Sequence, residues 1–245
     1  MNNISLKAYD IPERVKTYDL DMDVMHPLRH KMIEIVLDLL PFDQDATLKV
    51  MDLGAGTGIF SARVLERFPN STVTAVDGAE AMIDIAAERL GALADRLDWV
   101  IADFRRLPAE ILTAGSYDLV ISSYALHHLN VDEKLALLKQ VVKALKPGGW
   151  FLNADIAIAA DESIEQRLQQ LRIAGVMSRA QAGDKRFANA ESTRKYLTEM
   201  EIAENDQPQT AETDLRIIRE AGLPAAEIFW KELREVVAGG PKPVA

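Results

Sequence analysis

The feature that constrains the fold most is an apolar segment that runs directly into three closely spaced glycines. Residues 48–60 read LKVMDLGAGTGIF, and the first six are apolar enough to form a buried parallel strand. Gly54, Gly56 and Gly58 follow within five residues, and apolar side chains recur at helical spacing from Thr57 onward. This pattern predicts a strand, a glycine turn and a helix N-terminus, which together bring the backbone close to a ligand.

Strand-like and helical patterns alternate five times between residues 48 and 156. The predicted strands cover residues 48–53, 71–77, 97–102, 117–123 and 150–156. This alternation predicts an α/β fold with a doubly wound, mostly parallel, Rossmann-like sheet. The carboxyl ends of parallel strands share one edge of such a sheet, and ligands bind there beside the first strand. Asp52, Asp77, Asp103 and Ser122 all fall at these predicted strand ends.

The other segments are expected to surround this sheet within a single domain that spans all 245 residues. A helical cap covers about residues 1–40, although a clear helical pattern begins only at Pro27. A helical insertion at about 157–205 is expected to lie over the active site. Short strands at 226–230 and 233–238 are expected to form a terminal antiparallel hairpin.

Composition narrows the class of protein. The chain is 48% hydrophobic and 27% charged, which is ordinary for a globular protein, and it has no cysteine for a disulfide or a thiolate site. A net charge of −10 argues against a nucleic-acid partner. No apolar run is long enough for a membrane helix and no signal-peptide pattern opens the chain, so we expect a cytoplasmic protein with no membrane partner. The oligomeric state is left open, with a homodimer as one option.

The strand ends indicate which ligand the glycine turn holds. The nicotinamide fingerprint G-x-G-x-x-G needs a third glycine where this chain has Ile59, so no pyrophosphate signal is intact. Asp77, which lies 19 residues after Gly58, suits the hydroxyls of a ribose. Asp103 and Phe104 offer an acceptor for an exocyclic amine beside a ring that stacks on adenine. Together these residues predict a site for an adenosine without a diphosphate.

With these residues the sequence resembles a known family, the class I S-adenosylmethionine-dependent methyltransferases of the small-molecule type. The resemblance rests on motifs that occur in family order over about residues 47–155. They are Asp52-Leu53-Gly54-Ala55-Gly56-Thr57-Gly58, Asp77 after an apolar strand, Asp103-Phe104, Tyr117-Asp118-Leu119-Val120, Ala125-Leu126-His127-His128-Leu129 and Leu145-Lys146-Pro147-Gly148-Gly149.

The resemblance implies a mostly parallel seven-stranded sheet with an antiparallel last strand. It also implies S-adenosyl-L-methionine as cofactor and S-adenosyl-L-homocysteine as product. The residues that it assigns to the cofactor follow the parts of that molecule in order. They are Asp52, Gly54, Ala55 and Gly56 at the methionine end, Asp77 at the ribose, Gly78 and Met82 beside the adenosine, Asp103 and Phe104 at the adenine, Ser122 and Tyr124 at the methyl group, and Tyr18 as a cap.

Methyl transfer from a sulfonium is an in-line displacement, in which a protein mainly aligns the reactants and excludes water. A general base is needed only when the acceptor carries a proton that must leave. His127, Tyr124 and Asp155 are the candidates for such a base or for an orienting group. No metal site is predicted, because the four-residue spacing of His26 and His30 is accompanied by no acidic motif.

The leading hypothesis is therefore a methyltransferase for a small-molecule acceptor. A module that binds S-adenosylmethionine without catalysis would share every cofactor motif. An enzyme that remodels the cofactor, of the carboxy-S-adenosylmethionine synthase type, would need a cation for the added carboxylate. An NAD-dependent oxidoreductase explains the sheet and Asp77, but Ile59 and the Asp103-Phe104 pair count against it. The motifs do not select the acceptor, which can be attacked at O, N, S or C.

Overall fold

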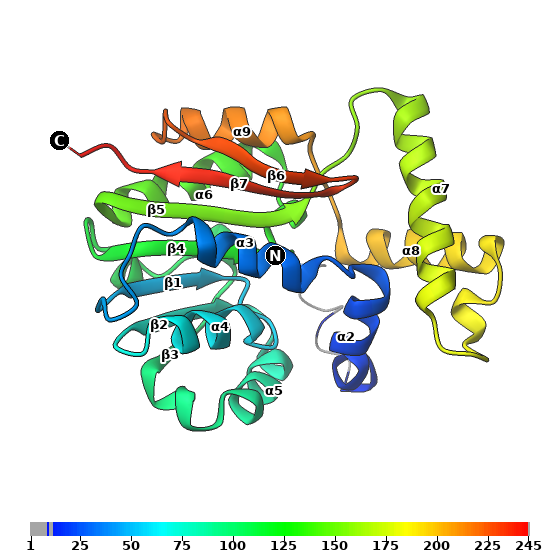
Figure 1. The fold of residues 1–245 in the computed structure, drawn as a ribbon, viewed down its shortest axis with the longest axis horizontal. Coiled ribbons are helices and arrows are strands. Elements are labelled where there is room, and N and C mark those ends of the chain that lie inside the picture. Colours follow the sequence, from blue (N-terminus) through cyan, green and yellow to red (C-terminus); the bar gives the residue numbers. More distant parts are fainter. Residues whose placement is uncertain (1–8, 10–11, 245) are drawn as a thin grey trace.

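The protein is built on one seven-stranded sheet with strand order β3-β2-β1-β4-β5-β7-β6 (Figure 1). The computed structural model describes residues 9 and 12–244. The strands are β1 (Lys49–Leu53), β2 (Thr72–Asp77), β3 (Leu97–Ile101), β4 (Tyr117–Ser123), β5 (Leu145–Ile156), β6 (Glu227–Glu232) and β7 (Glu235–Pro241). The helices are α2 (Pro12–Met25), α3 (Arg29–Leu39), α4 (Ile59–Arg67), α5 (Glu80–Leu90), α6 (Val131–Ala144), α7 (Glu162–Arg179), α8 (Ala190–Glu204) and α9 (Ala211–Glu220).

The five strands from β1 to β5 are parallel, and β7 is antiparallel to both of its neighbours. In the centre of the sheet, Val50 of β1 pairs with Val73 of β2 on one side and with Leu119 of β4 on the other. This topology confirms the predicted fold class, including the antiparallel hairpin at the end of the chain. Strand β5 starts earlier than expected, because Leu145 already pairs with Tyr117 of β4, and Gly148 and Gly149 then bond to Lys242 through backbone hydrogen bonds of 2.9 and 2.8 Å.

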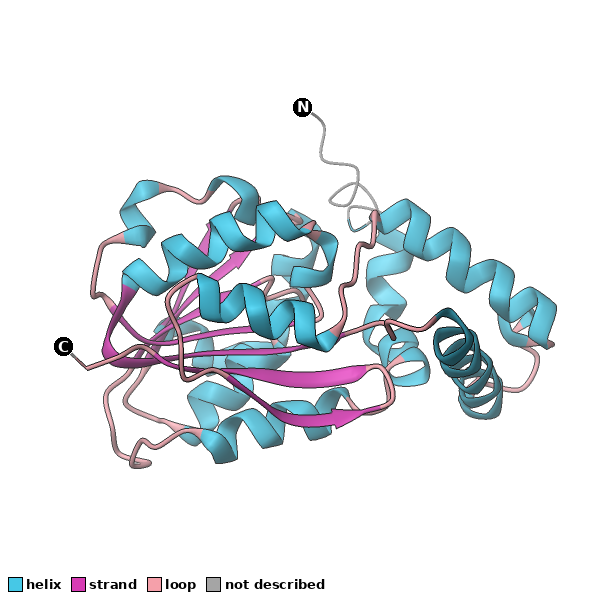
Figure 2. Cartoon of the chain, turned by 90° about the horizontal axis from the view of Figure 1, so that it is seen from above, coloured by secondary structure: helices cyan, strands magenta, loops and turns pink. Residues whose placement is uncertain are grey.

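Helices cover both faces of the sheet (Figure 2). Successive side chains of a central strand point to opposite faces, so both kinds of position are covered by helices. Val50 packs in the cluster that holds the inner sides of α3, α4 and α5. The next residue, Met51, packs in the cluster that holds α6 and α9. Both residues are fully buried. The near-continuous apolar sequence of β1 follows from this two-sided burial.

Helices α2, α7 and α8 form a separate group beyond the carboxyl ends of the parallel strands (Figure 1). Their contact is a small apolar cluster that includes Met25 of α2, Val176 of α7 and Leu197 of α8. An ion pair adds to it, since Arg186 contacts both carboxylate oxygens of Asp21 at 2.8 Å. The apolar residues of α2 do not recur at helical spacing in the sequence. Contacts with α7, rather than an apolar stripe, hold this helix in place.

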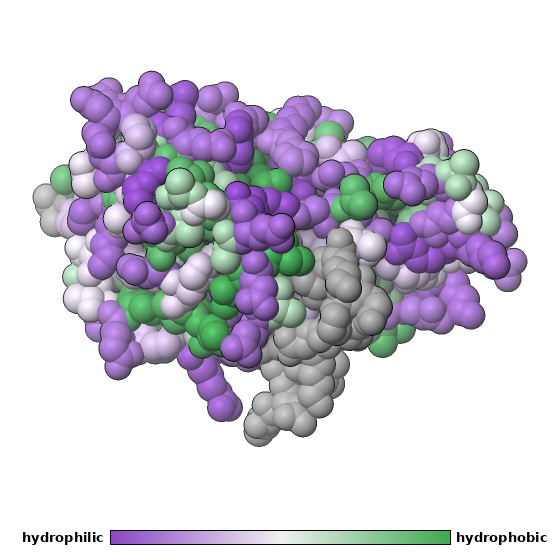
Figure 3. Space-filling view, turned by 90° about the horizontal axis from the view of Figure 1, so that it is seen from below, coloured by the Kyte–Doolittle hydropathy of each residue, from purple (hydrophilic) through white to green (hydrophobic). Residues whose placement is uncertain are grey.

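The surface is mainly hydrophilic, as the net charge of −10 suggests. Seen from below, hydrophilic side chains cover most of the molecule, with apolar side chains gathered near the centre (Figure 3). Among the described residues, none of the helices has an apolar stretch of the length that a membrane crossing requires.

Candidate functional site

The glycine turn after β1 is shaped by contacts that only glycine allows. Gly54 has φ +74°, and a Cβ at this position would lie 2.3 Å from Cβ of Ala125. Its backbone N–H donates to the carbonyl of Val76 at 2.8 Å, which ties the turn to β2. The turn is therefore held against the neighbouring strand end, with its backbone open toward the edge of the sheet.

One hollow opens beside this turn at the end of β2. We call it the Asp77 hollow; it encloses about 500 Å³ and is lined by Gly54, Gly56, Asp77, Gly78, Met82 and Phe104, among others. Asp77 Oδ2 accepts a hydrogen bond from the N–H of Gly56 at 2.7 Å, and its Oδ1 accepts one from Ala79 at 2.8 Å. The carboxylate thus sets the shape of the glycine turn and also borders the hollow.

A second hollow lies on the other side of the glycine turn, and we call it the Asp52 hollow. It encloses about 350 Å³ and is lined by Arg29, Asp52, Ala55 and Ser123, among others. Asp52 is 1% exposed, and its Oδ2 accepts a hydrogen bond from Ser61 at 2.7 Å. Burial, together with the charge of Asp77, raises the pKa of Asp52 to about 7, although the Ser61 bond acts in the opposite direction.

The Asp52 hollow carries opposite charges with unused hydrogen-bonding atoms. Within the part of the chain that the structure describes, Oδ1 of Asp52 and Nε of Arg29 are buried without a hydrogen-bond partner. An ammonium group suits the carboxylate and a carboxylate suits the guanidinium. The amino end of the methionine part of S-adenosylmethionine therefore suits Asp52, whereas the guanidinium of Arg29 is already paired with Asp19 at 3.0 Å.

A third hollow, the His127 hollow, lies between the sheet edge and the helices α2, α7 and α8. It encloses about 540 Å³, and tyrosines, methionines and acids line it together with His127. Tyr18 and Tyr124 line all three hollows. The three hollows therefore adjoin one another at these two side chains.

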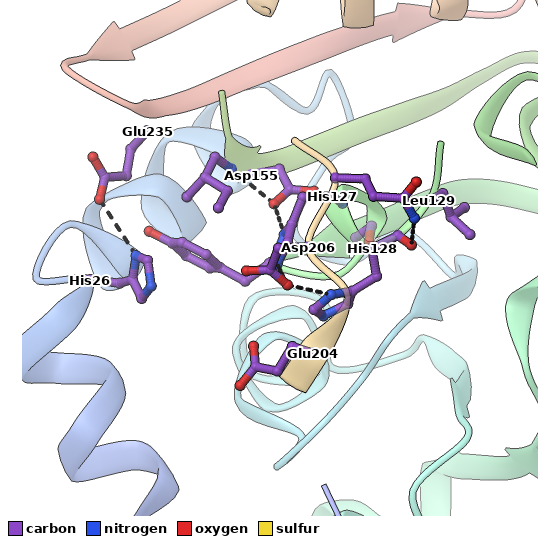
Figure 4. Close-up of polar contacts among 12 residues, drawn as sticks. His26, His127, His128, Leu129, Asp155, Glu204, Asp206 and Glu235 are labelled. Atoms are coloured by element: carbon purple, nitrogen blue, oxygen red, sulfur yellow. Dashed lines mark hydrogen bonds and ion pairs between the residues drawn. The ribbon is translucent and has the colours of Figure 1, made fainter. Parts of the chain in front are cut away.

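His127 is held in place by Asp155, the last acid of β5 (Figure 4). Nδ1 of His127 lies 2.6 Å from Oδ1 of Asp155, and the backbone N–H of His127 donates to Oδ2 at 3.0 Å. Burial alone would lower the pKa of His127, but the charge and hydrogen bond of Asp155 raise it above 6.5. Burial would raise the pKa of Asp155, yet the charge of His127 holds it at about 2.

The third catalytic candidate, Tyr124, keeps its proton at neutral pH. Its side chain is 7% exposed, and burial, followed by the charges of Glu235 and Asp155, raises its pKa well above 10. Its hydroxyl donates weakly to the sulfur of Met32 at 3.5 Å. The ring of His26 lies 4.6 Å away, centre to centre. Tyr124 thus forms a packed wall of the site rather than a base.

One of the predicted roles needs correction. Ser122 does not border any of the three hollows, because it is fully buried and its Oγ donates to the carbonyl of Leu53 at 2.7 Å. Ser123 borders two of them instead, since successive side chains of β4 point to opposite faces. Of the two roles considered for Asp155, base or orienting group, the geometry favours the second, because Asp155 is 2% exposed, ionised and directed at His127.

The remaining predicted residues lie at the same edge of the sheet. Asp103 caps the short 3₁₀ helix after β3 by accepting the N–H of Arg105 at 2.9 Å, and Phe104 reaches the Asp77 hollow. A direct contact of Asp103 with adenine stays a prediction. Sequence motifs did not point to Arg29 or Asp206, because each lies in a segment without a motif and reaches the site only through the fold.

Several known proteins with similar sequences are methyltransferases by name. A family model described as a methyltransferase domain matches residues 50–149. The chain is 31% identical to a malonyl-[acyl-carrier protein] O-methyltransferase of Priestia megaterium over 152 residues, which cover 62% of this chain and 52% of the relative. It is 28% identical to a ubiquinone/menaquinone biosynthesis C-methyltransferase of Roseobacter denitrificans over 215 residues, which cover 86% of this chain and 79% of the relative.

A solved structure shows the same fold. An O-methyltransferase family protein of Burkholderia thailandensis superposes with a TM-score of 0.63 at 22% identity, covering 92% of this chain and 58% of the other. The chain thus spans about half the length of the first of these relatives and little more of the solved protein. These comparisons agree with the resemblance to the class I S-adenosylmethionine-dependent methyltransferases that the motifs indicated. The cofactor of that family fits the Asp77 and Asp52 hollows.

Proposed function

We propose that the protein transfers the methyl group of S-adenosylmethionine to a small molecule bound in the His127 hollow. The observation that carries the proposal is the meeting of three hollows at Tyr18 and Tyr124. Asp77 stands at one end and Asp52 at another, where they suit a ribose and an ammonium group. The third hollow would hold the acceptor, beside the place where the adenosine and methionine parts of the cofactor join.

The residues of the chain act mainly by position. The cofactor supplies an electrophilic methyl group, and the Asp77 and Asp52 hollows fix its direction. Tyr18 and Tyr124 lie at the junction of the hollows, where their rings exclude water from the line of attack. His127 is the one candidate that can take a proton from an acceptor, because its Nδ1 is held by Asp155 and its Nε2 is left for the hollow.

The acceptor is proposed only as a class. The two similar proteins are by name an O-methyltransferase and a C-methyltransferase, so they support a small acceptor without selecting the attacked atom. The walls of the His127 hollow combine aromatic rings, methionines and acids, which suits a partly apolar molecule with a polar group. A protein that binds the cofactor without catalysing a reaction would have the same cofactor site. Only a measurement of turnover distinguishes that alternative from the proposed methyltransferase.

Calorimetry with S-adenosylhomocysteine tests the cofactor half of the proposal. We expect saturable binding to the full chain, weakened about 10- to 150-fold in Asp77→Ala, since a hydrogen bond to a charged group contributes about 1.5–3 kcal/mol. Asp84→Ala is the matched control, because Asp84 is an exposed acid on the adjacent helix α5. Absence of binding to the unaltered protein would overturn the proposal. Formation of S-adenosylhomocysteine from S-adenosylmethionine with a panel of phenol, amine and thiol acceptors then tests turnover.

A further inference from the structure

The side chains of His127, His128 and Asp206 converge beside the His127 hollow (Figure 4). Nε2 of His127, Nδ1 of His128 and a carboxylate oxygen of Asp206 all lie within 4.8 Å of one another. Oδ1 of Asp206 is 2.9 Å from Nδ1 of His128 and 3.7 Å from Nε2 of His127. All three side chains are 7% exposed, so water screens this cluster very little.

The backbone holds the three residues together firmly. His127 and His128 end a short 3₁₀ helix after β4, and Asp206 follows the end of α8. The N–H of Gln207 donates to the carbonyl of His127 at 2.8 Å, and the N–H of Asp206 donates to the carbonyl of Glu201 at 2.9 Å. The cluster is thus preformed by main-chain hydrogen bonds, one of which joins distant segments.

Hydrogen bonds on the far side of each ring determine which nitrogen faces the cluster. Asp155 is an acceptor, so Nδ1 of His127 carries a proton toward it and Nε2 is directed at the cluster. The hydroxyl of Tyr9 donates its proton to Glu204 at 2.9 Å and lies 3.2 Å from Nε2 of His128. With Nε2 of His128 on the side of Tyr9, its Nδ1 lies on the side of Asp206.

The facing atoms do not satisfy one another. Nδ1 of His128 and Oδ1 of Asp206 have no hydrogen-bond partner among residues 9 and 12–244, because their approach at 2.9 Å lacks the alignment of a hydrogen bond. A buried carboxylate oxygen beside two imidazole nitrogens is unfavourable unless a proton or a metal cation lies among them.

We propose that His127, His128 and Asp206 bind a divalent first-row transition metal ion, with Zn²⁺ as the best match. Two imidazole nitrogens and one carboxylate are a ligand set that such ions prefer, and they leave coordination positions open. His127 and Asp206 line the His127 hollow, so the open positions face the space proposed for the acceptor. The bonds of Asp155 and Tyr9 to the two rings are the outer contacts that orient imidazole ligands in metal sites.

The site differs from the histidine pair considered in the sequence. His26 pairs with Glu235 at 3.7 Å and His30 with Asp23 at 3.3 Å, so these histidines do not share a site. With an ion bound, Nε2 of His127 no longer serves as a base, and an acceptor oxygen or water on the ion would lose its proton more readily instead. The ion site itself does not require methyl transfer, so the two proposals can fail separately.

Metal titrations of the full chain, treated with a chelator and free of S-adenosylhomocysteine, test the site. We expect saturable binding of one Zn²⁺ per chain by calorimetry. With Co²⁺ we expect a visible absorption band of the kind that a Co²⁺ ion of low coordination number gives. Asp206→Asn and His128→Gln should weaken binding by more than about 100-fold, while Asp155→Asn should weaken it about 10- to 100-fold as an outer partner. Circular dichroism confirms that each variant is folded.

His30→Gln is the matched control, because it removes an exposed histidine that also lies beside an acid. Its Zn²⁺ affinity should equal that of the unaltered protein. The proposal is overturned if the unaltered protein binds no Zn²⁺ or Co²⁺ stoichiometrically, which would mean that a proton lies between His128 and Asp206. It is equally overturned if folded Asp206→Asn binds Zn²⁺ as tightly as the unaltered protein does.

Discussion

Replacing Asp52 by asparagine should stabilise the protein while it weakens cofactor binding. The carboxyl group is buried, and its pKa of about 7 lies far above its ordinary value of 3.8. Between these two pH values the folded protein keeps a proton on Asp52 that the unfolded chain has released. The stability of the unaltered protein therefore falls as the pH rises through this window. An asparagine side chain cannot ionise, so Asp52→Asn escapes this loss.

The magnitude follows from the pKa difference. Each pKa unit corresponds to about 1.36 kcal/mol, so the stability advantage of Asp52→Asn should grow by about 3 kcal/mol between about pH 5 and about pH 7. Above about pH 7 the advantage should stay constant, because Asp52 is then ionised in both states. The asparagine oxygen can still accept the hydrogen bond from Ser61, so little packing is lost.

Urea unfolding at several pH values measures this difference directly. Asp38→Asn is the control, since Asp38 is an exposed acid of α3 and its replacement should leave the pH profile unchanged. An advantage of Asp52→Asn that is independent of pH, or a loss of stability at pH 8, would refute the reasoning. In parallel, S-adenosylhomocysteine should bind the unaltered protein more weakly below about pH 7, because protonated Asp52 no longer attracts an ammonium group.

Three further predictions concern other parts of the site and the core. Asp155→Asn should lower the pKa of His127, because the charge of Asp155 raises it; NMR titration of the imidazole proton should show a lower midpoint, and an unchanged midpoint would contradict the assignment. Gly54→Ala should cost about 2 kcal/mol or more in thermal or urea unfolding, because φ is +74° and the new methyl group would clash with the neighbouring loop. Lys134→Met should cost about 3–5 kcal/mol by leaving Asp214 buried without its partner at 2.6 Å, and the double variant with Asp214→Leu should recover most of it; equal stability of single and double variants would contradict this.

Elements that are specified by residues close together in the sequence were predicted well, and elements that depend on contacts between distant residues were not. The strands of the sheet were predicted to within about a residue at most ends, because burial on both faces demands a continuous apolar run. Helix α2 was not located, since its residues carry no apolar stripe and it is held by α7 and by the ion pair of Asp21 with Arg186. The start of β5 was also missed, because Leu145 belongs to the strand through its pairing with Tyr117 of β4, while Lys146, Pro147, Gly148 and Gly149 interrupt the apolar run.

For the site, local motifs predicted the cofactor end and missed the acceptor end. The glycine turn and Asp77 each follow a strand directly, so chain connectivity alone places them together at the sheet edge. Ser122 was misassigned because the choice between it and Ser123 depends on which face of β4 points to the site. His127 was recognised, but its neighbours Arg172 and Asp206 come from α7 and from the segment after α8, which carry no motif.

By itself, the sequence predicted the α/β sheet, the resemblance to methyltransferases and a place for the cofactor. These properties depend on apolar periodicity and on residues near one another in the chain, so they can be read locally. The tertiary structure alone decided the raised pKa of Asp52, the pairing of His127 with Asp155 and the convergence of His128 with Asp206. Each of these depends on burial or on contacts between distant segments, and such contacts exist only after the chain has folded.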